Sequence, residues 1–455
     1  MKKNIVFKHQ LFCYSIILLL SFFPLRGLAQ SAWTLEQCIR YAYENNIQLK
    51  QQMLDVERAE NDFLQSKLNL LPNFSISSNF SSSRGKVLDQ NTFTVSEGVT
   101  VNSLSGGISS NVTLFRGLQQ KNIIDRDMYS LLASYQNVEK LKNDLSINIT
   151  LYFLQIIHAQ EQLTIAENQL KLTQMQIERT RQLVKAGSLP EGSLYELQSQ
   201  VAYEDLQIVT ALGRLEFARL NLAQLLDLGT AANFQVVSPD FSNITISGPT
   251  TSVLDLFMTA YSVMPQVKAA EYHLKSAEKQ LSIARGYRSP TLSLSGGYNT
   301  RYSSSAKIYN SNFEALNYPL GRQLKDGISS YIGLGLSVPV FNGWQVQTGI
   351  KNAALNLQNN WYQLQIIHNN LYKEIQQAHT DAVESYKRYI ASTRAVVSIE
   401  EAFRYTEHRY EAGLVNFVDY TTAKTRLATA QSDLVQAKFE YIFKTKVLDF
   451  YRKIR

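Results

Sequence analysis

The chain has few cysteines and few long hydrophobic runs. Only two cysteines occur in 455 residues, which excludes the disulfide-stapled scaffolds of small secreted domains. Beyond the first 30 residues no segment offers the roughly 18 consecutive apolar residues of a membrane-spanning helix. The rest of the chain therefore has no predicted transmembrane helix.

The chain also lacks the residue patterns of catalysis and of metal binding. Gly333-x-Gly335 has neither the third glycine nor the following helix of a nucleotide loop, and no nucleophile elbow or catalytic carboxylate pair is found. The five histidines beyond the first 30 residues form no H-x-x-x-H pair and have no acidic companion; they are His158, His273, His368, His379 and His408. The sequence predicts no enzyme, no metal site and no cofactor.

The first 29 residues have the pattern of a secretory signal peptide. An apolar run from Leu11 to Phe23 follows three lysines, and small residues flank Leu28. The run is too short to span a bilayer, so we expect cleavage after Ala29. No cysteine follows that position, which argues against a lipoprotein anchor.

The positive charge is concentrated in this leader. Lys2, Lys3, Lys8 and Arg26 are four of the 45 basic residues, so the net charge of +7 falls to about +3 after cleavage. We therefore predict no nucleic-acid partner. Cys13 leaves as well, and Cys38 alone cannot form an internal disulfide.

The remaining chain aligns with itself. With a shift of 218 positions, residues 42–52 fall on 260–270, and with a shift of 226, residues 113–117 fall on 339–343. The second shift also places Ala186-Gly187 on Ala412-Gly413. We therefore predict two structural repeats, 30–227 and 253–455, joined by a linker at 228–252 that is rich in Gly, Pro, Ser and Asn.

Each repeat contains a long seam with a period of seven. Its apolar positions are Ile149, Ile156, Leu163, Leu170, Ile177 and Val184, and then Ile375, Ala382, Tyr389, Val396, Phe403 and Tyr410. Three positions further stand mostly small residues: Tyr152, Ala159, Ala166, Thr173 and Thr180, and then Ala378, Ser385, Ser392, Ile399 and Thr406. This pattern predicts coiled-coil packing of long, closely approaching helices. An ordinary long helix in a soluble bundle is the alternative.

Between these helical stretches the apolar period changes to two. We predict β-hairpins at about 73–115 and 291–341, with strands of about 9 to 12 residues, the length of a tilted strand that crosses a bilayer. Phe115, Phe341 and Trp344 stand where strand returns to helix, as interfacial aromatic residues do. A pair of soluble hairpins is the alternative.

Four strands cannot close a barrel by themselves. An open sheet edge is not tolerated in lipid, so subunits would have to share strands. Three copies would supply twelve strands, an even number as barrels require.

The order of these elements resembles the TolC-type outer membrane efflux family. The motifs are LEQCIRYAYENN, SPTLSLSGGY, VPVFNG and RYEAGLVNFVDY, and the similarity runs from Trp33 to about Tyr451. It implies a mixed α and β membrane protein: a homotrimer whose twelve-stranded outer-membrane β-barrel, four strands per chain, is continuous with a coiled-coil helical tunnel through the periplasm. Residues 228–252 would lie in the equatorial belt of that tunnel.

The resemblance also implies a function and partners. The protein would be the outer-membrane channel of a tripartite efflux or type I secretion system, giving substrates a passive exit. Its partners would be two further copies, a periplasmic adaptor protein, an inner-membrane pump of the RND or ABC type, and outer-membrane lipid. An exported coiled-coil envelope protein, such as an adhesin or a spacer without a channel, is the alternative.

In this family the hairpin tips contact the adaptor through an R-L-x-x-G-like motif. The second repeat matches it as Arg409-Tyr410-x-x-Gly413, whereas the first offers Leu183 and Gly187, with Arg181 displaced by two positions. The resemblance therefore implies adaptor contact at Arg409, Tyr410, Gly413, Leu183 and Gly187. Glycines that simply end helices are the alternative.

The resemblance further implies an acidic periplasmic aperture. Asp419 follows Gly413 by six residues, where the family carries an aperture aspartate, while Thr422 departs from the family's second aspartate. Glu196 stands at the equivalent place in the first repeat. In a trimer, Asp419 and Glu196 would form carboxylate rings that favour cations. Acids that stabilise the starts of the return helices are an equal alternative.

Overall fold

The computed structural model describes residues 32–89, 94–229, 234–238, 247–312 and 314–453. The predicted signal peptide and parts of the predicted linker lie outside these ranges. The chain divides into a helical unit, Met1–Ile47, Lys142–Ser252 and Gln376–Phe450, and a sheet-containing unit, Gln48–Leu141, Val253–Ile375 and Tyr451–Arg455.

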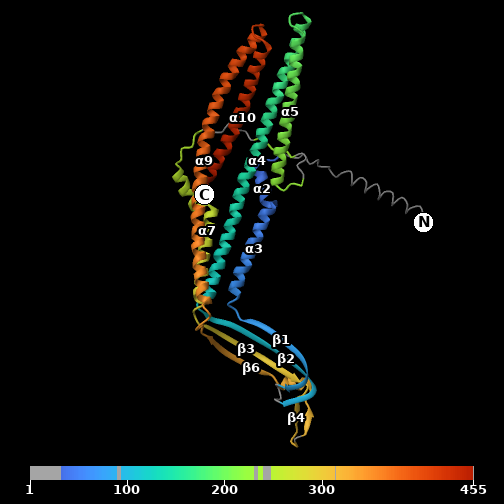
Figure 1. The fold of residues 1–455 in the computed structure, drawn as a ribbon, viewed down its shortest axis with the longest axis vertical. Coiled ribbons are helices and arrows are strands. Elements are labelled where there is room, and N and C mark those ends of the chain that lie inside the picture. Colours follow the sequence, from blue (N-terminus) through green and yellow to red (C-terminus); the bar gives the residue numbers. More distant parts are fainter. Residues whose placement is uncertain (1–31, 90–93, 230–233, 239–246, 313, 454–455) are drawn as a thin grey trace, which may run out of the picture. The chain divides into compact units, whose positions relative to one another are not determined.

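Two helical hairpins form most of the helical unit. Helices α4 (Gln119–Lys185) and α5 (Gly192–Leu225) make the first hairpin, and α9 (Gln345–Glu411) and α10 (Phe417–Lys453) make the second. Within each hairpin the two helices lie side by side (Figure 1). Both α4 and α9 have 67 residues, so each continues well beyond this unit.

The predicted seam is confirmed by burial. Ile149, Ile156, Ile375 and Ala382 are completely buried, and none of the other seam residues is exposed. The small residues beside them, such as Ala159, are buried or half-buried as well. Helices approach closely where such side chains face one another, and the heptad spacing keeps these side chains on one stripe.

A hydrophobic core near the chain start ties the hairpins together. It contains Phe153, Ile157, Leu222 and Ile442, with Trp33 packed against it. The short helix α2 (Leu35–Asn45) adds Cys38 to this core and begins with a capping box formed by Thr34 and Gln37. Cys38 is a buried thiol without a disulfide partner, and burial raises its pKa to about 12.

Part of the linker is held against this core. Trp33 pairs with Val236 in a parallel bridge, and its backbone N–H donates to the Gln235 carbonyl at 2.8 Å. The hydroxyl of Tyr441 donates to the Ser247 carbonyl at 3.1 Å. The described parts of residues 228–252 thus pack on the helices.

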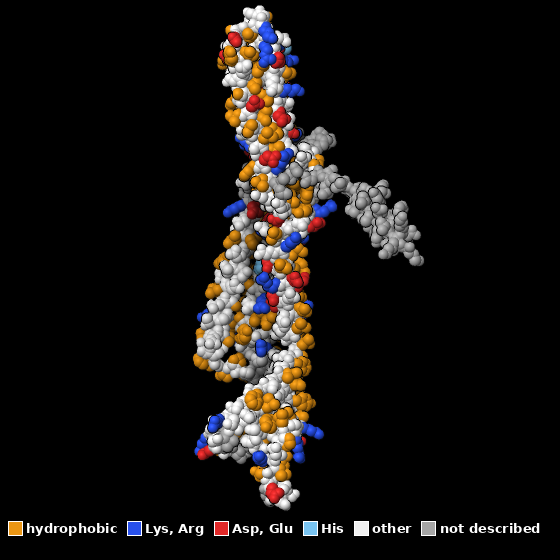
Figure 2. All heavy atoms as spheres, turned by 90° about the vertical axis from the view of Figure 1, so that its right-hand side faces the viewer, with side chains coloured by type: hydrophobic (Ala, Val, Ile, Leu, Met, Phe, Trp, Pro, Cys, Tyr) orange, Lys and Arg blue, Asp and Glu red, His pale blue; other side chains and the backbone are white. Residues whose placement is uncertain are grey.

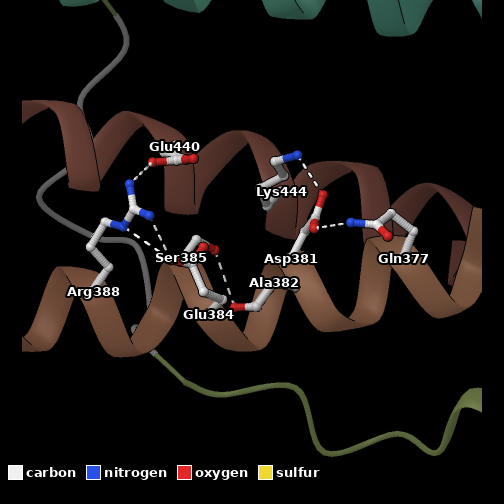
Figure 3. A network of polar contacts seen from close by, with 8 residues as sticks. All are labelled: Gln377, Asp381, Ala382, Glu384, Ser385, Arg388, Glu440 and Lys444. Carbon is white, nitrogen blue, oxygen red and sulfur yellow. Dashed lines mark hydrogen bonds and ion pairs between the residues drawn. The ribbon is translucent and has the colours of Figure 1, made fainter.

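Polar side chains link α9 to α10 within the second hairpin (Figure 3). Lys444 Nζ lies 2.6 Å from the Asp381 carboxylate, and Arg388 bridges Glu384 at 2.6 Å and Glu440 at 3.2 Å. Because Arg388 and its partners are partly exposed to water, these pairs contribute little to stability.

The sheet-containing unit combines a four-stranded antiparallel sheet with shorter helices and with parts of α4 and α9. The sheet has the order β1-β2-β3-β6. Its strands are β1 (Asn73–Asp89), β2 (Thr94–Arg116), β3 (Thr291–Ser303) and β6 (Ser329–Ser337). The helices are α3 (Ile47–Leu68), α6 (Val253–Val263) and α7 (Pro265–Gly286).

The strand lengths partly correct the prediction. Strands β1 and β2 have 17 and 23 residues rather than 9 to 12, because their pairing continues past the apolar alternation, through a register shift between Gly85 and Val87. The second hairpin also contains a small ribbon, β4 (Lys307–Tyr309) with β5 (Ala315–Asn317), and helix α8 (Leu320–Asp326). Sequence alternation did not predict these insertions.

The return from strand to helix uses the same backbone conformation twice. Gly117 and Leu118 have φ of 53° and 58°, and Gly343 and Trp344 have φ of 60° and 68°. A Cβ at Gly117 would lie 2.6 Å from the Gly286 carbonyl oxygen, so glycine is required there for space as well as for its backbone angle. The sequence Phe-x-Gly, at residues 115–117 and again at 341–343, therefore marks the start of a two-residue left-handed turn.

Candidate functional site

The two hairpin tips end their first helix in the same way. Gly187 and Gly413 have φ of 74° and 72°. At the second tip the N–H of Gly413 donates to the Tyr410 carbonyl at 3.0 Å, and that of Leu414 donates to the Arg409 carbonyl at 2.8 Å. Gly187 and Ser188 make the equivalent bonds at the first tip. This pattern is a Schellman motif, which ends a helix with a glycine in the left-handed region.

The helices that leave the tips begin differently. At the second tip the Asn416 side chain accepts a hydrogen bond from the Asp419 N–H at 2.8 Å, so it caps the N-terminus of α10. At the first tip Glu191 stands before α5 without a side-chain cap. The second tip is therefore the more firmly fixed at its helix start.

An aromatic cluster fills the second tip. The ring of Tyr410 stacks on that of Tyr420 with centroids 4.6 Å apart, and Phe403 packs against Tyr420 at 5.7 Å. Burial raises the pKa of the Tyr410 hydroxyl, with a smaller contribution from the nearby Glu196 carboxylate, while a hydrogen bond with Gln176 opposes it. Tyr410 thus lies where the two hairpins meet.

An ion pair also joins the two tips. The Arg179 guanidinium on α4 contacts the Glu411 carboxylate at the end of α9. That hydrogen bond lowers the pKa of Glu411, with a smaller effect from His408 at 3.6 Å. Sequence reasoning missed this contact, because the partners stand 232 positions apart and neither belongs to a motif.

The predicted tip residues divide into two groups. Arg409, Leu183 and the two tip glycines are exposed, whereas Tyr410 is half-buried. No side chain lies within 4 Å of the positions a Cβ would take at Gly187 or Gly413. The Arg409 and Leu183 backbones contribute to the Schellman bonds, and their side chains are accessible to a partner.

The two predicted aperture acids are exposed as well. Asp419 lies in the first turn of α10, and its N–H is the group that Asn416 caps. Glu196 lies in the second turn of α5, close enough to Tyr410 to act on its pKa. The structure therefore brings Glu196 to the aromatic cluster and places Asp419 at a helix start.

The second candidate feature is one face of the sheet. Cross-strand partners align Ile76 with Ile108 and Tyr298, and Val112 with Leu294 and Leu334. Because side chains alternate between the faces of a strand, the aligned apolar residues share one face; they are Phe74, Ile76, Phe80, Leu104, Ile108, Val112, Leu292, Leu294, Tyr298, Tyr302, Ile332, Leu334 and Leu336. We call this set the apolar face.

The opposite face is polar or small. One aligned row on this face joins Ser75, Ser109 and Gly297. Almost every other position on the face is occupied by Asn, Ser, Thr or Gly. The Ser75 and Ser109 hydroxyls are 2.8 Å apart and hydrogen-bonded. The sheet is thus strongly two-sided.

Much of the apolar face is exposed in the described part of the chain. Ile76 and Ile332 are each 81% exposed and Leu334 is 69% exposed, and hydrophobic side chains lie open on the surface of the strands (Figure 2). Leaving such a face in water costs about 25 cal/mol for each Å². A sheet of this kind needs an apolar environment.

The two outer strands leave their edges open. In the described residues, β1 pairs only with β2, and β6 pairs only with β3. Unpaired strand edges bind further strands. The sheet is therefore incomplete in a single chain.

Neither a spanning helix nor a metal cluster is found in the described part of the chain. No helix there is both long and apolar enough to cross a membrane. No group of three or more His, Cys, Asp or Glu side chains there is arranged to hold a metal ion.

Comparison with known proteins gives consistent matches. The family described as outer membrane efflux protein matches residues 38–227 and 259–442. Outer membrane protein TolC of Escherichia coli K12 is 22% identical over 439 residues, covering 94% of this chain and 83% of that protein. TolC of Vibrio cholerae serotype O1 is 22% identical over 418 residues, covering 91% and 90%.

The fold matches solved structures of the same kind. The outer membrane protein VceC of Vibrio cholerae aligns with a TM-score of 0.76 at 16% sequence identity, covering 92% of this chain and 95% of that one.

Proposed function

Because the chain belongs to the outer membrane efflux protein family, we propose that this outer-membrane protein is the exit channel of a tripartite efflux or type I secretion system. In this function it does no chemistry and consumes no energy. Substrates delivered from the inner membrane pass through its interior to the outside.

The apolar face is the observation that carries this proposal. An apolar face exposed on a sheet with two open edges is unfavourable in water but suits a lipid bilayer, provided that the edges pair. The polar opposite face would then line the lumen. An exported adhesin or spacer built on the same coiled coil would have no use for such a sheet.

We infer a homotrimer from the open edges. Four strands per chain become twelve in three copies, with β1 of one copy pairing with β6 of the next. Closure would satisfy every edge, as lipid requires. The long helices would continue the barrel as a tunnel through the periplasm.

We also propose a division of the chain between these parts. Residues 30–227 and 253–455 would be two structural repeats, each giving one β-hairpin and one long helical hairpin with its tip near 187 or 413. Residues 228–252 would form the equatorial belt. The common length of α4 and α9 and the shared Schellman motif support this division.

The hairpin tips would meet a periplasmic adaptor. The exposed side chains of Arg409 and Leu183, at tips fixed by Gly413 and Gly187, offer a polar and an apolar contact. Tyr410 would hold this surface in place and would not contact the adaptor directly, because its ring is stacked on Tyr420. Through the adaptor the channel would serve an inner-membrane pump of the RND or ABC type.

Asp419 and Glu196 would form the aperture. Their exposure at the starts of α10 and α5 leaves both carboxylates accessible to ions. Threefold symmetry would make each a ring, and such rings favour cations.

Fractionation tests the proposal. The mature chain should sediment with the outer membrane and migrate as a trimer in native mass measurements in detergent. Inserted into planar bilayers, it should conduct ions without any energy source. Recovery as a soluble periplasmic monomer would contradict the channel and support the spacer alternative.

A further inference from the structure

Two charged side chains are buried between the helical hairpins, and in the described part of the chain they are the only charged residues that are buried. They are Glu204 on α5 and Lys424 on α10. Their side chains are 8% and 5% exposed, and Lys424 Nζ lies 2.9 Å from Glu204 Oε1. Neither residue belongs to a motif recognised in the sequence.

The pair is fully hydrogen-bonded. Lys424 Nζ donates to the Gln169 carbonyl at 3.0 Å and to the Thr173 hydroxyl, both on α4. The Thr173 hydroxyl donates to Glu204 Oε2 at 2.5 Å, and Gln200 Nε2 donates to Glu204 Oε1 at 2.8 Å. The network therefore joins both helices of the first hairpin to one helix of the second.

Net energy alone does not account for such a pair. Moving two charges out of water costs about as much as their attraction returns, and apolar replacements of the same size are often neutral. Breaking the pair by removing one partner is costly, because one charge is left buried and unpaired. Buried polar groups of this kind have their best-attested role in fixing the register of coiled coils.

The surrounding seam needs such a device. Along α4 the small seam positions Ala159, Ala166, Thr173 and Thr180 repeat at every heptad. Side chains of similar size accept their partners at more than one axial position, so shape alone discriminates weakly. Among the described residues, only the level of Thr173 places a buried cation opposite a buried carboxylate.

We propose that Lys424, Glu204 and Thr173 form a register pin, which fixes the axial position of the second hairpin against the first and so keeps their tips level. Lys424 and Glu204 are positioning residues here. The inference depends on the fold and not on transport. It predicts that the tip contact between Arg179 and Glu411 depends on a pair buried further along the helices.

The test replaces the pair by methionines of similar length. Lys424→Met with Glu204→Met is made in the full-length chain with Cys38→Ala, and Arg179→Cys with Glu411→Cys reports the tips through a short thiol-specific cross-linker. We expect a thermal midpoint close to that of the parent but a several-fold slower cross-linking rate. An unchanged rate overturns the pin.

Two matched variants complete the test. Arg388→Met with Glu440→Met removes a partly exposed pair between α9 and α10 and should leave both the midpoint and the cross-linking rate unchanged. Lys424→Met alone should lower the midpoint below that of the double variant, because Glu204 stays buried without its cation; a midpoint equal to the parent's counts against the network.

If the double methionine variant fails to assemble, the exchange Lys424→Glu with Glu204→Lys tests the register pin in its place. Recovery of the parent cross-linking rate supports the pin, because the exchange restores the ion pair at the same level. Assembly with a slow rate overturns it, and so does failure of the exchange to assemble.

Discussion

The sheet and the helical unit treat the same residue type in opposite ways. Ile149 and Ile156 on α4 are completely buried, whereas Ile76 on β1 and Ile332 on β6 are 81% exposed. The helices turn their apolar stripe toward one another, and the sheet turns its apolar face away from the protein. The difference teaches that the two regions suit different surroundings, and in the proposed channel these are water for the helices and lipid for the sheet.

A charge placed on the apolar face should have the largest effect of the changes considered, because it makes an exposed sheet residue unfit for lipid. We expect Ile76→Lys to prevent stable insertion, because lysine at a lipid-facing position costs up to about 2–4 kcal/mol and a trimer carries it three times. The measurement is the yield of trimer folded into lipid vesicles. The matched control is Ser77→Lys, one residue along β1 on the polar face, which should fold normally. Equal loss in both variants would refute a lipid-facing assignment.

A cavity in the helical unit should have the next largest effect, and of a different kind. Ile156→Ala removes buried methyl groups from the core and should lower the unfolding free energy by about 2–5 kcal/mol. The measurement is denaturant unfolding of the purified chain, with Gln155→Ala, at an exposed neighbouring position, as control. Insertion into vesicles should be unaffected, so the two regions respond to different tests.

The sequence predicted both stripes because each depends on a short period. Seven-residue spacing places Ile149 and Ile156 on one stripe of a helix, and alternation places Ile332 and Leu334 on one face of a strand. Strand lengths and inserted elements depend on which segments pair in three dimensions, and these local periods do not encode that pairing. The pairing that carries β1 past Gly85 and the insertion of α8 left no periodic signal in the sequence.

Within the candidate site, the residue pattern alone could predict only those positions whose backbone conformation requires a particular residue type. The left-handed turn requires glycine, so Gly187 and Gly413 could be found from the sequence. The contacts of Arg179 with Glu411 and of Lys424 with Glu204 could not, because helical surfaces carry many charged residues and spacing does not choose among partners over 200 positions apart.

Changes at the second tip should separate assembly from transport. Gly413→Val forces a β-branched residue to a φ of 72°, at a local cost of about 1–3 kcal/mol, and Arg409→Glu reverses an exposed charge. Both should spare insertion and trimer formation yet reduce substrate export in a strain lacking the native gene. The readout is export of the substrate alongside trimer yield. Full export by both variants would contradict adaptor contact at this tip.

A smaller effect is expected at the proposed aperture. Asp419→Asn with Glu196→Gln should lower cation selectivity and weaken block by multivalent cations in planar-bilayer recordings, since neutral rings no longer attract cations. The control is Asp205→Asn, at an exposed position further along α5. Unchanged selectivity in the double variant would assign Asp419 and Glu196 to helix starts alone.

The smallest effect is the pH dependence of the tip ion pair. Arg179 lowers the pKa of Glu411, so the pair stabilises the folded state fully above the pKa of an unfolded glutamate, about 4.3. Its contribution is lost as the pH falls through the still lower folded value. The thermal midpoint of the parent should therefore exceed that of Glu411→Gln slightly at pH 7, and the gap should close below about pH 4.

His408 also faces Glu411, with its Nδ1 3.6 Å from the carboxylate, so the effect of Arg179 has to be separated from this second contact. Arg179→Met makes this separation: because Arg179 is the main cause of the lowered pKa of Glu411, the midpoint difference caused by Glu411→Gln at pH 7 should shrink in the Arg179→Met background. If the gap at pH 7 survives in the Arg179→Met background, Arg179 is not the group that lowers the pKa of Glu411. Because Arg179 and Glu411 are both partly exposed, added salt should reduce the gap at every pH.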